Sequence, residues 1–131
     1  MKRLAVLLTL IAAPAGATET YHCAVQDFST FTRGDTAFIE NNLKKDFLMN
    51  VGSGQIQLDM KSEHYGDAIT TYRIAHRRNN NLTALDDDPA RLGALTVPKN
   101  IQARLDRNGY FNATLSVNGS FYANTWLLRC Q

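Results

Sequence analysis

Residues 99–131 constrain the fold more than any other stretch, because apolar and polar side chains alternate there along runs that glycine-containing turns separate. A period of two is typical of a strand with one buried face. Three antiparallel strands are therefore predicted, at Ile101–Leu105, Phe111–Val117 and Ser120–Cys130. A slip of one residue would turn each buried face outward, so the turns must specify the register.

Both turns in this stretch have a recognisable chemistry. Asn118–Gly119 is favoured in a two-residue type I′ turn, which would place Phe111 opposite Trp126. Arg107–Gly109 predicts a three-residue loop whose glycine is left-handed. The two turns agree on one apolar face, made of Phe111, Ala113, Leu115, Val117, Tyr122, Trp126, Leu128 and Cys130.

A second hairpin is predicted around Gly52–Gln55, a four-residue connection between two alternating runs. It would pair Val51 with Ile56. The same register continues along one face, with Met49 opposite Leu58 and Phe47 opposite Met60.

Shorter patterns complete the fold prediction. Strands are expected at Tyr21–Val25, Ile69–His76 and Leu82–Leu85, whereas Ala37–Leu43 fits either a strand or a short helix. Asp88 before Pro89 is typical of a helix start and Gly93 of a helix end, which predicts one short helical turn at 89–93. The fold class is therefore all-β, an antiparallel meander of about 7–8 strands that forms a small lipocalin-like barrel or a sandwich.

The first 17 residues have the pattern of a secretory signal peptide. Lys2 and Arg3 precede the apolar run Leu4–Ala13, and Ala15–Ala17 forms a small-residue cleavage site. The apolar run is too short for a membrane-spanning helix. Cleavage is expected before Thr18, leaving residues 18–131 as a single β domain in the bacterial periplasm or secreted, with no membrane insertion.

Signal removal changes the charge balance. The chain has 14 basic and 12 acidic residues, and two of the basic ones are Lys2 and Arg3, so residues 18–131 carry 12 of each. A formally neutral domain gives no support for a nucleic-acid partner.

The two cysteines lie near opposite ends of this domain. Export places them in an oxidising compartment, where an even count of two allows a single disulfide, Cys23 with Cys130. Such a bond requires the first and last strands to be neighbours, with α-carbons within about 7 Å.

The sequence contains no recognisable catalytic or metal-binding motif, and no cofactor is expected. His22, His64 and His76 are the only histidines, and none has the spacing of a zinc ligand. Asp86–Asp88 does not match an EF-hand loop. A non-enzymatic protein is therefore predicted. An unrecognised hydrolase that uses His64 or His76 is the competing hypothesis, because catalytic triads assemble in space.

The sequence is compatible with two kinds of binding. A small apolar or amphipathic ligand in the barrel would contact large inward side chains, which otherwise simply form the core: Phe47, Met49, Leu58, Met60, Tyr72, Phe111, Tyr122 and Trp126. An envelope protein, such as a hydrolase that the chain inhibits, would contact the loops at Ser29–Asp35, Glu63–Asp67 and Asp86–Leu92.

The combination of a small exported chain, cysteines near both ends and a strand meander is similar to bacterial periplasmic β-barrels such as lysozyme inhibitors and lipocalin-like proteins. The resemblance is architectural and covers no motif, so it implies a barrel and no specific activity.

Overall fold

The computed structural model describes residues 18–31 and 34–131, with the side chain of Asp87 left out. The predicted signal peptide, residues 1–17, lies outside the described residues.

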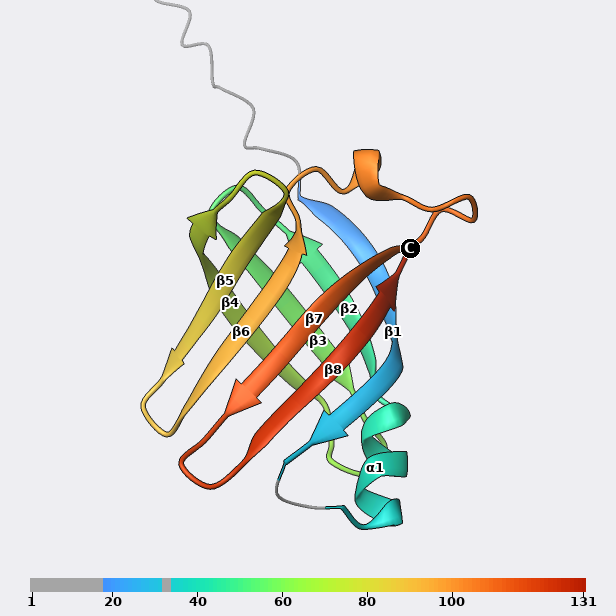
Figure 1. Ribbon diagram of the computed structural model, residues 1–131, viewed down its shortest axis with the longest axis vertical. Helices are drawn as coiled ribbons and strands as arrows, with labels where there is room; N and C mark the ends of the chain where they lie inside the picture. The colour runs from blue at the N-terminus through green and yellow to red at the C-terminus, as the bar shows by residue number, and fades with distance from the viewer. Residues whose placement is uncertain (1–17, 32–33) are drawn as a thin grey trace, which may run out of the picture.

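Eight antiparallel strands form one closed barrel in which each strand pairs with the next and β1 pairs with β8 (Figure 1). This confirms the all-β prediction and decides for a barrel over a sandwich. The strands are β1 (Glu19–Thr30), β2 (Asp46–Val51), β3 (Gln55–Lys61), β4 (Ala68–Arg77), β5 (Asn81–Asp88), β6 (Arg91–Pro98), β7 (Phe111–Asn118) and β8 (Ala123–Cys130). Between them lie the helix α1 (Thr36–Leu43) and the 3₁₀ turn η1 (Gln102–Arg104).

The barrel has two different ends (Figure 1). At the helix end, α1 joins β1 to β2, and short turns join β3 to β4, β5 to β6 and β7 to β8. At the η1 end are the β2–β3 and β4–β5 turns and the long connection, residues 99–110, that contains η1.

The hairpin of β2 and β3 has the predicted register. Val51 pairs with Ile56, Met49 with Leu58 and Phe47 with Met60. The Gly52 N–H donates to the Gln55 carbonyl, 2.9 Å away, which closes the four-residue turn.

The hairpin of β7 and β8 has the predicted face but a different register. Phe111 pairs with Cys130 instead of Trp126, and the turn is the four-residue loop Gly119–Tyr122. The Gly119 N–H donates to the Tyr122 carbonyl, and the Tyr122 ring lies where a Cβ on Gly119 would stand. Because the shift is an even number of residues, Trp126 and Cys130 still point inward.

Two predicted elements are wrong. The helical turn expected at 89–93 is a tight β-turn, in which Asp88 Oδ1 accepts from the Ala90 N–H, and residues 91–98 form β6. The strand expected at Ile101–Leu105 is η1 with its flanking residues. Asp88 gives the same local hydrogen bond in a turn as at a helix start, which explains the first error. The single α-helix of the described residues is α1, in the segment where the sequence fits either a strand or a helix.

The Arg107–Gly109 turn forms as predicted, although no strand precedes it. Gly109 has a φ of 80°, in the left-handed region, and the Asp106 N–H donates to the Tyr110 carbonyl. The Asp106 carboxylate accepts from the Asn108 and Tyr110 N–H groups and pairs with Arg129 at 3.0 Å.

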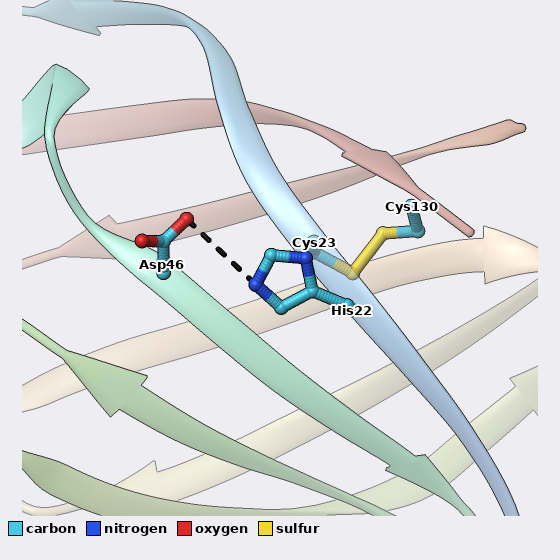
Figure 2. Close-up of a disulfide and its surroundings, with 4 residues drawn as sticks. All are labelled: His22, Cys23, Asp46 and Cys130. Atoms are coloured by element: carbon cyan, nitrogen blue, oxygen red, sulfur yellow. Dashed lines mark ion pairs between the residues drawn. A yellow bond between two sulfur atoms is a disulfide. The ribbon is translucent and has the colours of Figure 1, made fainter.

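A disulfide joins the first strand to the last. Cys23 and Cys130 are paired residues of β1 and β8, their α-carbons lie 4.0 Å apart, and both side chains are fully buried. Figure 2 shows this bond beside His22, which points to Asp46 on β2 across a distance of 4.0 Å. That ion pair is solvent-exposed and contributes little stability.

Candidate functional site at the helix end

Six of the eight side chains predicted to line a ligand or fill the core are buried inside the barrel: Phe47, Met49, Leu58, Tyr72, Phe111 and Trp126. Met60 is partly buried and packs against this core, and Tyr122 is 37% exposed in the β7–β8 turn. Four clefts in the described residues are lined mainly by residues of turns and strand ends, and of the eight predicted side chains only Phe111 contacts one of them. The six buried side chains therefore pack the interior.

Charged and polar groups reach the inside of the barrel at the helix end. Lys45 stands two residues before Phe47 and has the same inward orientation, and its amino group lies 4.7 Å from the centre of the Tyr65 ring and 4.8 Å from that of Trp126. Burial, followed by the positive charge of Arg91, lowers the pKa of Lys45 to about 8. Lys45, Tyr65, Arg91 and Trp126 are called the mouth site below.

Trp126 adds an unpaired donor to the mouth site. Its side chain is 6% exposed, and within the described part of the chain its Nε1 has no hydrogen-bond partner. Lys45 Nζ likewise has no carboxylate within ion-pair distance among residues 18–31 and 34–131, the Asp87 side chain excepted. Both groups only donate, so neither can satisfy the other.

Tyr72 and Asp86 form the adjoining wall. Burial, and then the negative charge of Asp86, raise the pKa of Tyr72 to about 12, so its hydroxyl is neutral at ordinary pH. A Cβ on Gly93 would lie 3.1 Å from the Tyr72 ring and 3.2 Å from Asp86 Cβ, so a glycine is needed for these two side chains to pack here. Arg91 makes a long contact, 3.9 Å, with Asp88 across the same hairpin.

Helix α1 positions Tyr65 over this mouth. Asp35 starts the helix by accepting a 2.8 Å hydrogen bond from the Phe38 N–H. Phe38 then packs edge-on against Phe28 and Tyr65, with ring centres 5.7 and 6.5 Å apart. Asn42 is buried and donates to the Tyr65 hydroxyl, although its Oδ1 has no partner in the described chain.

The exposed large apolar side chains of the described residues gather at the same end. Each lies within three residues of a strand terminus there: Phe31, Leu43, Leu48, Tyr65, Ile69, Leu92, Phe121 and Tyr122. Phe31 and Phe121 are 89% and 87% exposed. They belong to adjacent segments, because the Phe31 N–H donates to the Ala123 carbonyl, 2.9 Å away. A concentration of this kind is typical of an interaction surface.

The three loops predicted to contact a protein also converge at the helix end. Residues 29–31 lie at the end of β1 and residues 34–35 precede α1, with residues 32–33 outside the described residues. Residues 63–67 join β3 to β4, and residues 86–92 span the β5–β6 turn. A polar cleft of about 800 Å³ opens at the second of these loops, lined by Asn41, Lys44, Asp46, Lys61, Ser62, Glu63, His64 and Asp67.

The structure does not bring the histidines together. His64 lies at the helix end, edge-on to the Tyr65 ring, whereas His76 lies near the η1 end of β4. In the described residues no group of three or more His, Cys, Asp or Glu side chains could hold a metal ion. Nor does any helix there have the length and apolar character needed to cross a membrane.

Comparisons with protein-family models, with curated proteins and with solved structures gave no match to this chain.

Sequence reasoning identified Trp126 and the loops but missed Lys45, Tyr65 and Arg91 as parts of one site. Together with Trp126 they come from four separate parts of the chain, so no spacing in the sequence connects them. One signal was present: Lys45 continues the alternation of Phe47 and Met49, which would place a lysine on the buried face.

Proposed function

We propose that the protein is a small exported binding protein, without catalytic activity, that acts by docking a protein partner on the helix end of its barrel. The closed barrel is compatible with a small binding protein. The buried disulfide fits an oxidising compartment outside the cytoplasm.

The observation that carries this proposal is the gathering of exposed apolar side chains at one end. Phe31 and Phe121 lie on adjacent segments and are almost completely exposed, which is unfavourable because it keeps apolar surface in water. A partner that covers both rings would remove this cost. Aromatic anchors at the centre of an interface commonly supply most of the binding energy. We therefore assign Phe31 and Phe121 as the anchors.

The filled interior favours an external partner over the small apolar ligand predicted from the sequence. The largest fully buried side chains include Met49, Ile56, Leu58, Leu95 and Leu128. A barrel of eight strands is just wide enough for its own side chains. The interior ligand stays a prediction, which native mass spectrometry of the purified protein would check by looking for added mass.

The proposal is tested by capturing partners from an envelope extract with the wild-type protein and with Phe31→Ser/Phe121→Ser. We expect one partner in a stoichiometric complex with the wild type, and a dissociation constant about 100-fold higher for the variant. Its free energy of unfolding should change by less than about 0.5 kcal/mol, because both side chains are exposed.

Ile69→Ser is the matched control. Ile69 is 65% exposed near the same end, but on β4, across the barrel from β1 and β8. Because Ile69 lies away from the two anchors, this variant tests for nonspecific apolar binding and should raise the dissociation constant far less than Phe31→Ser/Phe121→Ser. Equal capture by all three proteins, or capture of no stoichiometric partner, would contradict the proposal.

A further inference from the structure

We propose that the mouth site is a receptor for a carboxylate, which the partner supplies as an aspartate or glutamate side chain held between Lys45 Nζ and Trp126 Nε1. This inference rests on the proposed docking at the helix end and specifies the chemistry of the partner there.

The first step is the shortage of acceptors. The ammonium group of Lys45 is partly buried between two aromatic rings, with Trp126 Nε1 on one of them. Cation–π contact stabilises the ammonium but gives its N–H groups no acceptor. Trp126 Nε1 is a buried donor without a partner in the described chain, which lowers stability, and an oxygen placed beside it and Lys45 Nζ would recover that free energy.

The second step is the sign of the missing group. Arg91 is the charged residue that acts on Lys45, and it adds a second positive charge to the mouth. The acidic groups of the β5–β6 hairpin that adjoin this site contact other residues: Asp86 lies against Tyr72, and Asp88 lies 3.9 Å from Arg91. An incoming anion would therefore meet a partly buried cation that has no counterion among the described side chains.

The third step is shape. The site offers one ammonium and one indole N–H beside flat aromatic surfaces, which suits a planar group with two acceptor oxygens. A phosphate would require more donors for its additional oxygens and charge. Because Phe31 and Phe121 lie at the same end, the acidic side chain should be flanked by apolar residues in the partner.

Benzoate is the probe for this site, and benzamide is its neutral counterpart of nearly equal shape. Trp126 is the only tryptophan in the chain, so its fluorescence reports on the mouth alone. We expect a saturable change with benzoate and at least about tenfold weaker binding of benzamide, as for the loss of one charge-assisted hydrogen bond.

Lys45→Met should abolish the benzoate response, while Lys44→Met, which neutralises the adjacent exposed lysine, should retain it. NMR titration of the Lys45 amino group in the wild-type protein provides a measurement that does not depend on a folded variant. Bound benzoate should raise the pKa of Lys45 from about 8, since a negative charge favours the ammonium form.

The outcomes separate this inference from the proposed function. Equal binding of benzoate and benzamide, or an unchanged Lys45 pKa, overturns the carboxylate receptor even if Phe31→Ser/Phe121→Ser still loses its partner. Partner affinity that is the same for Lys45→Met and Lys44→Met overturns the assignment of the carboxylate to the partner. If free benzoate binds tightly and no protein partner is captured, the ligand is a small-molecule carboxylate. That result overturns both the docking of a protein and the assignment of the carboxylate to a partner side chain.

Discussion

The two ends of the barrel differ in how completely their side chains are satisfied. At the η1 end, the disulfide is buried beside an edge-on pair of Tyr21 and Phe111, whose ring centres are 4.9 Å apart. The Asp106 carboxylate accepts two backbone hydrogen bonds and pairs with Arg129. Within the described residues, the helix end instead holds a partly buried lysine without a counterion, an unpaired indole N–H and two exposed phenylalanines.

This difference indicates that one end of the barrel mainly stabilises the fold and the other end mainly binds a partner. Interactions that are complete within the chain stabilise the fold and leave little for a partner to satisfy. Unpaired donors and exposed rings reduce stability, but they become favourable when a partner supplies the missing contacts. Perturbing the η1 end should therefore change stability, whereas perturbing the helix end should change binding and its dependence on pH.

The largest effect is expected from the disulfide. Replacing both cysteines, Cys23→Ser/Cys130→Ser, removes a bond across 107 residues and should lower the free energy of unfolding by about 4 kcal/mol, as the loop-entropy relation predicts. Urea unfolding monitored by circular dichroism measures the change.

Under conditions where this double variant remains folded, its benzoate affinity should equal that of the wild type. A parallel loss of affinity would show that the two ends are coupled, which contradicts the division between them.

An intermediate effect is expected from pH. The pKa of Lys45 is about 8 in the folded chain and near 10.5 in the unfolded chain, so between these values the unfolded state binds more protons. Stability should therefore rise from pH 8 to pH 10, by on the order of 1 kcal/mol given partial access of water to the side chain. Arg91 stays charged in this range, and Tyr72, with a pKa of about 12, titrates above it.

Urea unfolding at several pH values measures this slope. Lys45→Met should remove the slope between pH 8 and 10, and Lys44→Met should keep it. If Lys45→Met keeps the slope, another titrating group causes it. The mouth site would then have no special role in the pH dependence of stability.

The smallest effect is expected at Asp106. The Tyr110 N–H is the main cause that holds the pKa of this exposed carboxyl below its ordinary value of 3.8. Its contribution is present above about pH 4 and is lost as the pH falls through the folded pKa. Amide chemical shifts of Asn108 and Tyr110 should move together in this range, and Asp106→Asn should abolish the movement. Independent movement would show that the turn is held by other contacts.

Sequence patterns predicted the β2–β3 hairpin in full, because a four-residue turn and the alternation of Phe47, Met49 and Val51 agree on one register. For β7 and β8 they predicted the buried face but not the register. The Asn118–Gly119 signal describes a two-residue turn, whereas the packing of Tyr122 on Gly119 moves the pairing by an even number of residues. Burial is insensitive to such a shift.

The prediction of a helical turn at 89–93 was wrong for a different reason. Asp88 and Pro89 are compatible with both a helix start and a hairpin turn, and the pairing of β6 with β7 decides for the turn. The mouth site depends on barrel closure as well. Lys45 and Trp126 are distant in sequence and come together only because β1 lies between β2 and β8. A pattern read along the chain does not contain that proximity.

Closure also determines when the protein can fold during its synthesis. β1 needs β8 as a neighbour, and β8 is made after the other seven strands. Until Ala123–Cys130 has been made, the unfinished sheet has an unpaired strand at each edge, and Cys23 has no cysteine with which to form the disulfide. Such long-range pairing is typical of slow folding. The barrel should therefore close only after Ala123–Cys130 has been made, and its first seven strands should stay largely unstructured until then.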